Sequence, residues 1–505
     1  MTSSFGTPSR FRIAILALLL TAFLGLVAAR LYSIQIIRHH DLGTRATGQY
    51  RRHIPVATKR GTIYDRRGRA LAISLDAASV FAHPGLIERP RATASRLAQV
   101  LKLPVREIEG KLRSDRPFVW IQRKVDPERV KALVKLNLQG VGLVPEGKRY
   151  YPKKNLAAHL IGFVGVDDRG LEGVELEYDR LLTGGSRSFV GRVDALRRIV
   201  FREAEESHAG SDLYLTIDEV IQHVAERHLT EAVRSSGAKA GTVVVMDPAT
   251  GEILALANTP SYNPNTYWKY RPAVRRNRAV TDSYEPGSAF KLVLAAAALE
   301  EKLVSPNDLF YGEGGVIEVA GTKIRDLGHE VAATSMQLIA AMSAVANGGN
   351  LVRPHVVKAV RNAGDGIEEI RPLPVRRVIS SETARTLTSI LTEVVERGTG
   401  QAAALQGYRV AGKTATAQKF DQKIGRYSHT KVMASFVGYV PAEDPRLAIL
   451  VLIDEPEGLA WGGSVAAPVF REIAQEVLGY LEIAPIHARD ERVVQRSYET
   501  PSRVN

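Results

Sequence analysis

The chain has 505 residues, too many for one compact core, and its 45% hydrophobic and 24% charged residues are typical of folded domains. Its formal charge of +14 favours negatively charged partners, but no zinc-finger spacing, RNP-type motif or dense basic stripe indicates nucleic acid. An anionic membrane or a carboxylate-bearing substrate fits that charge at least as well. The absence of cysteine excludes disulfides, iron–sulfur clusters, thiolate zinc sites and a cysteine nucleophile.

The first element is an apolar segment near the amino terminus. Residues 13–29 are uncharged, and together with residues 31–37 they can span a bilayer, with Arg30 snorkelling to its surface. A cleaved signal peptide is the alternative, but this apolar run is long for one, and further apolar residues follow the small ones. We therefore expect an uncleaved anchor with a short tail inside and the bulk of the chain outside.

Residues 45–205 mix short strand-like runs with helical stretches. Residues 60–68 (RGTIYDRRG) have the pattern of a strand, a charged turn and a second strand, and residues 170–175 (GLEGVE) that of a loop entering a helix. Helices are predicted at residues 92–101 and 127–136. No residue of this region by itself indicates chemistry, so we expect a structural module that holds the next domain away from the membrane.

The pattern changes from about residue 210 onward. An amphipathic helix is predicted at 220–233, and strands at 241–248 and 252–258 form a hairpin. Further strands are predicted at 409–419, 432–440 and 447–453, and further helices at 288–301, 335–346, 382–397 and 469–481. Thr334 and Gln337 have capping-box spacing at the start of one of these helices. Hairpin strands flanked by helices indicate an α+β domain with an antiparallel sheet.

Residues 286–291 (PGSAFK) open a predicted apolar helix and carry the first candidate chemistry. Ser288 and Lys291 are three residues apart, so their side chains share one face of a helix. The free N–H groups and dipole of the first turn favour negative charge developing at Ser288. A serine hydroxyl needs a base, and Lys291 serves if its pKa is lowered. The same Ser-x-x-Lys spacing at residues 236–239 precedes a strand, and we interpret it as a loop.

The second piece of chemistry is residues 412–417 (GKTATA), on a predicted edge strand. Small residues such as Gly412 let a ligand approach the backbone, while Lys413 and Thr414 can hold a carboxylate. Either piece alone is a common pattern. Together, in this order and in these settings, they match the active-site set of penicillin-recognising serine enzymes.

The chain resembles the class B penicillin-binding proteins, closest to the septal cell-division transpeptidases, over nearly its whole length. The nucleophile segment resembles the family at residues 284–288 (YEPGS) and 290–291. The other resembling segments are residues 30–32, 60–68 and 170–175 before it, and 434–438, 444–446 and 466–470 after it. The resemblance implies an α+β chain with one transmembrane helix, a pedestal of the dimerisation type, and a transpeptidase domain with a five-stranded antiparallel sheet flanked by helices. The expected bounds are 1–40 for tail and anchor, 41–208 for the pedestal, 209–484 for the transpeptidase domain and 485–505 for a disordered tail.

The resemblance also implies a reaction and its partners. Ser288 attacks the penultimate carbonyl of a D-Ala-D-Ala stem peptide of peptidoglycan, Lys291 takes the proton, and the acyl group passes to an amine on a neighbouring strand. The backbone N–H groups of Ser288 and Thr416 form the oxyanion hole, and Lys413, Thr414 and Thr416 bind the terminal carboxylate. β-Lactams acylate the same serine. No metal or organic cofactor is implied, and the further partners expected are the membrane and a membrane glycosyltransferase of the division machinery.

The sequence departs from the family in one place. The family's Ser-x-Asn motif lies in a helical lobe, but here residues 325–327, which resemble the family just before that lobe, run directly into residues 328–331, which resemble it well after. Ser305-Pro306-Asn307 is too close to Lys291, and we interpret it as a helix-ending turn. A smaller departure is Ala415, where glycine is usual. Without the lobe, we expect an open cleft, a better solvated Lys291 and a pKa too high for its role.

Three hypotheses follow. The chain is an active transpeptidase, a catalytically impaired scaffold of the same fold for the division or elongation machinery, or a membrane-bound β-lactam sensor or hydrolase. The pedestal and the lack of an obvious deacylating carboxylate argue against the third. The absent lobe argues for the second, unless the sequence is an incomplete form of the gene product.

Overall fold

The computed structural model describes residues 8–39, 42, 51–57, 59–184, 186–193, 199–204, 210–309, 316–319, 322–325, 331–362, 366–422, 424–458 and 461–485. The expected tail beyond residue 485 and the junction at residues 326–330 lie outside these ranges.

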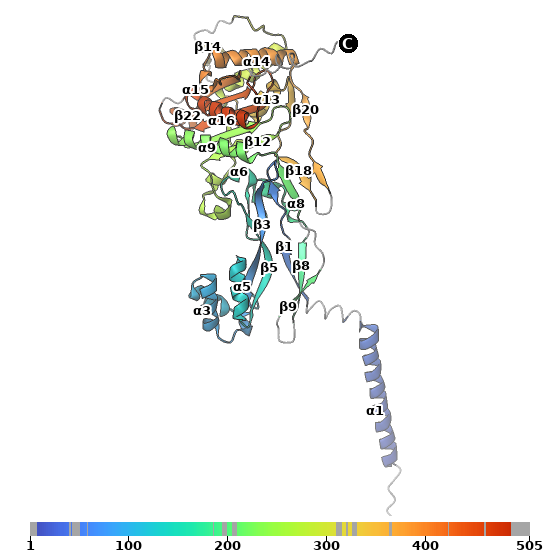
Figure 1. The fold of residues 1–505 in the computed structure, drawn as a ribbon. Helices are drawn as coiled ribbons and strands as arrows, with labels where there is room; N and C mark the ends of the chain where they lie inside the picture. Colours follow the sequence, from blue (N-terminus) through green and yellow to red (C-terminus); the bar gives the residue numbers. More distant parts are fainter. Residues whose placement is uncertain are drawn as a thin grey trace, which may run out of the picture.

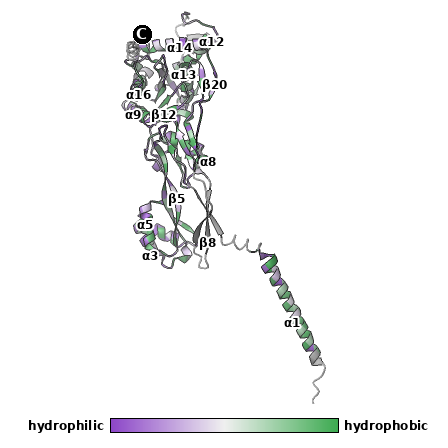
Figure 2. Cartoon of the chain, turned by 45° about the vertical axis from the view of Figure 1, so that its right-hand side comes forward, coloured by the Kyte–Doolittle hydropathy of each residue, from purple (hydrophilic) through white to green (hydrophobic). Residues whose placement is uncertain are grey.

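An apolar helix stands apart from the rest of the chain (Figure 1). Helix α1 (Pro8–Tyr32) continues into a π-helical turn (Ser33–Ile37). The stretch Phe11–Ile37 has 27 residues, and an 18-residue window within it has a mean hydropathy of 2.4 and no buried residue. Figure 2 shows α1 mostly in the green of hydrophobic residues, with purple, hydrophilic residues toward its ends. By length and composition this helix can cross a bilayer, as predicted for the anchor.

The pedestal is built around one long strand, β3 (Ala70–Ala82). Its neighbours are β2 (Ile63–Tyr64), β4 (Val119–Val125) and β5 (Val141–Tyr150), all antiparallel to it. Helices α3 (Pro90–Leu101), α4 (Val105–Leu112) and α5 (Pro127–Leu136) pack on the far end of this sheet and bury a separate apolar cluster. Helices α3 and α5 end at the residues predicted for them. Residues 60–68 contain the predicted first strand (β2) and turn, and the second strand, β3, begins just after them at Ala70.

Strands from far along the sequence complete the pedestal sheet at the end that faces the catalytic domain. Strand β10 (Asp212–Leu215) pairs with β2 in parallel and with β18 (Val357–Arg361) in antiparallel orientation, and β19 (Ile367–Glu369) follows at the edge. This seven-stranded sheet therefore joins the two halves of the chain. A separate three-stranded sheet, order β1 (Arg51–Ala57), β8 (Ser186–Val193) and β9 (Ile199–Ala204), lies toward the anchor (Figure 1).

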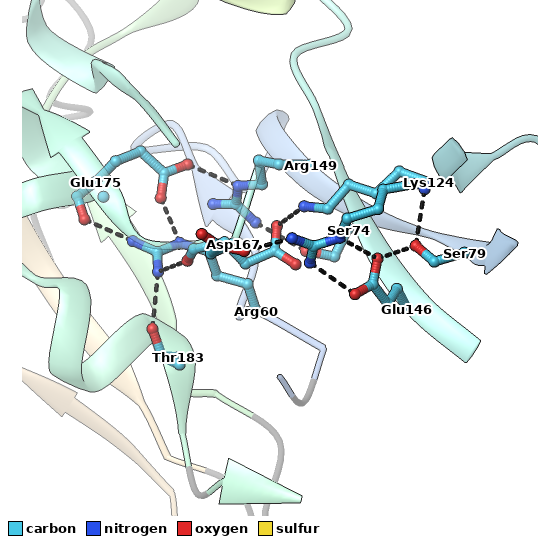
Figure 3. Close-up of polar contacts among 12 residues, drawn as sticks. Arg60, Ser74, Ser79, Lys124, Glu146, Arg149, Asp167, Glu175 and Thr183 are labelled. Atoms are coloured by element: carbon cyan, nitrogen blue, oxygen red, sulfur yellow. Dashed lines mark hydrogen bonds and ion pairs between the residues drawn. The ribbon is translucent and has the colours of Figure 1, made fainter. Parts of the chain in front are cut away.

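A buried carboxylate holds together two pedestal segments that are distant in sequence (Figure 3). Residues 170–175 form β7 (Gly170–Glu172) and the start of α7 (Gly173–Glu177), where a loop entering a helix was predicted. Glu175 is fully buried, and its carboxylate accepts hydrogen bonds from Arg60 Nε and Arg149 Nε, both at 2.6 Å. Buried charges are stable only when they are paired in this way.

The catalytic domain has a five-stranded antiparallel sheet in the order β12-β11-β23-β22-β21. The strands are β11 (Ala240–Met246), β12 (Ile253–Thr259), β21 (Ala411–Asp421), β22 (Arg426–Val440) and β23 (Leu447–Asp454). The predicted hairpin is β11 and β12, and β21 lies at the edge as predicted. The sheet therefore confirms the expected α+β class.

Helices cover both faces of this sheet. On one face, α9 (Glu219–Ser235) and α16 (Ala467–Tyr480) bury side chains against one cluster of strand residues. On the other, α13 (Ser335–Ala346) and α14 (Ser381–Glu396) bury theirs against a second cluster. The predicted capping box at Thr334 and Gln337 begins α13, with both of its hydrogen bonds formed.

Helix α12 (Lys291–Glu300) is uncovered on much of its surface. Of its ten residues only Leu292 is buried, whereas Leu294 is 64% exposed, and Leu303 just beyond the helix is 77% exposed. Between α12 and α13 the described residues add only a hairpin of β14 (Val316–Val319) and β15 (Thr322–Arg325), and β16 (Ala333–Thr334). An apolar helix face open to solvent is unusual for a folded domain, so it marks a side of the domain that the described residues leave uncovered.

Candidate active site

Ser288 lies in a tight turn that precedes α12. The turn Gly287–Phe290 is 3-10 helical, and the Lys291 N–H donates to the Ser288 carbonyl oxygen. The predicted helix began at residue 288, whereas the α-helix begins at Lys291. The reason is local. Pro286 has no N–H, and Gly287 has a φ of +54°, a backbone conformation that residues other than glycine rarely adopt. Ser288 and Lys291 are thus one 3-10 turn apart.

This turn packs against the edge strand β21. A Cβ on Gly287 would lie 3.4 Å from both the Ala417 Cβ and the Thr416 carbonyl oxygen. These are ordinary van der Waals distances, so the turn packs directly against the strand, and the positive φ of Gly287 is the reason for glycine there. Ser288 is half-buried at this contact, and Lys291 is exposed, as expected for a cleft with one open wall.

Lys413 is brought next to the lysine of the nucleophile turn. Its side chain is half-buried, and its Nζ donates to the Thr414 carbonyl oxygen at 2.9 Å. Burial and the positive charge of Lys291 both lower the pKa of Lys413. The charge of Lys291 therefore acts on Lys413, although the two residues come from distant parts of the sequence.

Thr414 and Thr416 lie on one face of β21, two residues apart. The Thr414 hydroxyl is 2.7 Å from the Thr399 hydroxyl, and the Thr416 hydroxyl accepts a hydrogen bond from the Gly462 N–H at 2.9 Å. Neither Thr399 nor Gly462 was among the site residues predicted from the sequence. Glycines next to each of them are the signal that could have revealed them, because such pairs mark turns that approach other backbone closely.

Gly412 has a packing reason to be small. A Cβ there would lie 2.5 Å from the Phe436 Cζ and 3.2 Å from the Val437 carbonyl oxygen, which is a severe clash. The predicted reason was close approach of a ligand, but the contact visible in the fold is with the neighbouring strand β22. Ala415 is buried and is accommodated within the domain core.

Two other motif matches lie away from this site. Ser305-Pro306-Asn307 is an exposed turn, in which the Asp308 N–H donates to the Ser305 carbonyl oxygen at 3.1 Å. Residues 236–239 connect the end of α9 to β11. Both are the loops that the sequence predicted.

The family models that match the chain cover both of its large parts. The penicillin-binding protein dimerisation domain matches residues 55–215, and the penicillin-binding protein transpeptidase domain matches residues 241–330 and 318–475. The peptidoglycan D,D-transpeptidase FtsI of Escherichia coli is 31% identical, with 94% of this chain and 92% of that protein aligned. The probable peptidoglycan D,D-transpeptidase PenA of Neisseria meningitidis is 33% identical, with 92% and 91% aligned.

The stage V sporulation protein D of Bacillus subtilis is a further relative, 31% identical over 91% of this chain and 84% of its own length. Among solved structures, penicillin-binding protein 2X of Streptococcus thermophilus shares the fold, with a TM-score of 0.69, 20% identity, and 85% of this chain and 80% of that one covered. The chain belongs to the class B penicillin-binding proteins.

The comparisons also bear on the missing lobe. The alignment with the E. coli protein extends over 548 positions, more than the 505 residues of this chain, so that relative has residues with no counterpart here. The transpeptidase model matches in two pieces that meet and overlap at residues 318–330. This is the region where the sequence predicted that a lobe had been excised.

Proposed function

We propose that the chain is a membrane-anchored peptidoglycan D,D-transpeptidase that cross-links stem peptides through an acyl-enzyme at Ser288. The observation that carries the proposal is the packing of the Ser288 turn against β21, with Lys413 close enough to Lys291 for the positive charge of Lys291 to lower its pKa. Family membership and the transpeptidase names of the relatives support the same reaction.

The reaction uses two successive acyl transfers. The Ser288 hydroxyl attacks the carbonyl of the penultimate D-Ala and passes its proton to the Lys291 amine, and the terminal D-Ala leaves with a proton. The N–H groups of Ser288 and Thr416 stabilise the oxyanion in both steps. An amine of a neighbouring strand then attacks the ester, forms the cross-link and restores the Ser288 hydroxyl.

Recognition of the terminal carboxylate falls to β21. Lys413 supplies the charge, and the hydroxyls of Thr414 and Thr416 supply hydrogen bonds from one face of the strand. Gly412 keeps this part of the strand flat against β22, because a side chain there would displace Phe436. No step in this scheme calls for a metal or an organic cofactor.

A second candidate function is a catalytically impaired scaffold of the division or elongation machinery. The exposed face of α12 and the exposed Lys291 favour it, because the nucleophile turn then has water on one side in place of a second protein wall. In this case the chain contributes to the division or elongation machinery through its fold alone and does not catalyse the reaction.

The proposed cellular setting follows from the anchor and the relatives. Residues 1–40 hold the chain in the cytoplasmic membrane, residues 41–208 form the pedestal, and residues 209–484 form the transpeptidase domain on the outer side, in the periplasm where there is one. The names of the relatives favour a role in division. A membrane glycosyltransferase of the division machinery is the proposed partner, because the peptide cross-linker acts on the strands that such an enzyme makes.

Labelling with a fluorescent penicillin tests the proposal on the full-length protein in detergent. We expect a stable covalent label on the wild type and none on Ser288→Ala. An unlabelled wild type that is folded would leave only the scaffold. A label that forms and is rapidly lost with turnover of the penicillin would instead indicate a hydrolase.

A further inference from the structure

A shallow cavity of about 430 Å³ lies on the surface of the pedestal, where α3 begins and α4 ends. Three of the residues that line it are arginines: Arg89 and Arg91 at the start of α3, and Arg113 just after α4. No acidic side chain is among the described residues of this lining, and the first turn of α3 contains none. The cavity therefore presents positive charge to an anionic ligand or surface.

The surroundings of the cavity neutralise this charge only in part. Arg113 forms an ion pair with Glu109, one turn earlier on α4, at 2.8 Å. Arg89 and Arg91 are exposed, and neither forms an ion pair with another residue of the described ranges. Glu88 precedes Arg89 in the sequence but does not line the cavity. Two guanidinium groups therefore remain available, and each presents its N–H donors in a planar fork that matches phosphate oxygens.

The part of the pedestal that carries this cavity holds much of the positive charge of the chain. Residues 88–136, here called the basic lobe, span α3, α4, β4 and α5 and contain 13 lysines and arginines against 6 aspartates and glutamates. Their balance of +7 is half of the +14 of the whole chain, although they make up only about a tenth of its length. An excess spread over a whole lobe favours an extended anionic surface over a single small anion.

The basic lobe lies at the end of the pedestal nearest the anchor. Figures 1 and 2 both show α3 and α5 at that end, away from the catalytic domain. Strand β1, where the chain enters the pedestal, packs against β5, which begins in the same region at Val141. Only residues 38–50 separate the apolar helix from β1, and such a segment spans at most about 45 Å. The membrane that holds α1 is therefore within reach of the basic lobe.

We propose that the basic lobe docks onto the surface of this membrane, with the cavity of Arg89, Arg91 and Arg113 binding the phosphate-bearing headgroups of anionic lipids. Each arginine near an anionic surface strengthens binding about fivefold, so three of them make a contact that is reversible but specific for charge. Docking would fix the height and tilt of the pedestal above the bilayer. The inference goes beyond the proposed function and does not depend on acylation of Ser288.

The distance between the basic lobe and the bilayer tests the proposal on the full-length protein in lipid nanodiscs. The chain has no cysteine, so Gln99→Cys, at an exposed position of α3 outside the cavity lining, provides a single site for a donor dye. A lipid with an acceptor dye on its headgroup reports the distance by energy transfer. We expect more transfer in nanodiscs that contain phosphatidylglycerol than in phosphatidylcholine alone, and the difference should disappear as the salt rises from about 50 to about 500 mM.

The triple variant Arg89→Gln, Arg91→Gln, Arg113→Gln tests whether the cavity makes the contact. In the anionic nanodiscs it should lower the ratio of docked to free lobe by about tenfold or more, because three favourable contacts are lost. The matched control makes the same change at three exposed arginines of the other half of the chain, Arg371, Arg376 and Arg385. It should keep the wild-type transfer in both lipids.

Equal transfer in the two kinds of nanodisc, or a difference that survives in the triple variant, would overturn the proposal. Inorganic phosphate at constant ionic strength tests the other source of the same chemistry. If millimolar phosphate abolished the difference, the cavity would bind a free phosphate, and docking on the membrane would be overturned. Penicillin labelling of the same samples reports the proposed function separately: labelling without docking overturns only the docking, and docking without labelling supports it while overturning the proposed function.

Discussion

The two ends of the catalytic domain are built differently. At its base, where it meets the pedestal, the contact is closed: the carboxylate of Glu226 accepts a hydrogen bond from the Ala157 N–H at 2.8 Å, and the Tyr262 hydroxyl donates to the Ala158 carbonyl oxygen at 2.9 Å. At the cleft, one wall is the well-packed strand β21, and the other is α12 with its apolar face exposed.

This difference shows what the domain can lose without losing its fold. The sheet, the nucleophile turn and the base are held by their own buried contacts, so residues missing from one wall need not disturb them. The wall formed by α12 is different, because the environment of Lys291 depends on which residues cover that helix. If the expected lobe is absent, the consequence is therefore expected in the chemistry of the cleft and not in the stability of the pedestal.

The largest expected effect is a loss of stability in the pedestal, which, like the base of the catalytic domain, is held by buried contacts. Glu175→Ala removes the carboxylate between Arg60 and Arg149, which leaves the buried guanidinium of Arg149 without an ion pair and that of Arg60 with Asp179 alone. We expect a loss of about 3–5 kcal/mol in the free energy of unfolding, measured by urea denaturation in detergent. Glu368→Ala, on an exposed strand, should change it by less than about 0.5 kcal/mol. A small effect of Glu175→Ala would mean that the pedestal is as open as the cleft.

Two leucines of α12 test the open side directly. Leu292 is buried against the core, and Leu292→Ala should cost about 2–3 kcal/mol of unfolding free energy. Leu294 is 64% exposed, and Leu294→Ala should cost less than about 0.5 kcal/mol. The same denaturation measurement serves both variants. A cost for Leu294→Ala as large as that for Leu292→Ala would show that this face of α12 is covered in solution.

The sequence predicted what depends on neighbouring residues. The ends of α3 and α5, the capping box of α13 and the hairpin of β11 and β12 each follow from a local pattern of apolar, capping and turn residues. The order of the two motifs was also visible, as was the direct junction of residues 325–327 with residues 328–331, because both are features of the sequence itself.

Contacts between distant segments could not be predicted in this way. The pairing of Glu175 with Arg60 and Arg149, and of Thr416 with the Gly462 N–H, joins residues that no local pattern connects. The start of α12 was misplaced by three residues because Pro286 and Gly287 set a 3-10 turn that the apolar periodicity does not reveal. The cavity of the basic lobe likewise brings Arg113 to Arg89 and Arg91 across two helices, and no local pattern connects them.

The base of the domain also gives a pH-dependent prediction. Burial raises the pKa of Glu226 to about 7 from 4.5, although hydrogen bonds from Gln222 and the Ala157 N–H act to lower it. The folded protein therefore holds a proton that the unfolded chain releases between these values. This contribution favours folding below pH 4.5 and is lost as the pH rises toward 7.

Glu226→Gln removes the buried charge while keeping an oxygen that can accept both hydrogen bonds. We expect the variant to gain stability relative to the wild type, and the gain to be larger at pH 8 than at pH 5 by about 1–2 kcal/mol. Denaturation at the two pH values measures this difference. A gain that is the same at both would mean that Glu226 is already solvated, and that the base is no better closed than the cleft.

The smallest effect expected is a shift within the cleft itself. The positive charge of Lys291 contributes to the lowered pKa of Lys413, so Lys291→Met should raise that pKa toward its ordinary value, while the part due to burial remains. Competitive acetylation of lysines across a range of pH, read by mass spectrometry, measures the pKa of Lys413. Lys239→Met, on the connection between α9 and β11, is the control and should leave it unchanged. If Lys291→Met also leaves the pKa of Lys413 unchanged, water in the cleft screens the two amines from one another. The open side of the cleft would then separate Lys291, the proposed base, from strand β21, which carries Lys413.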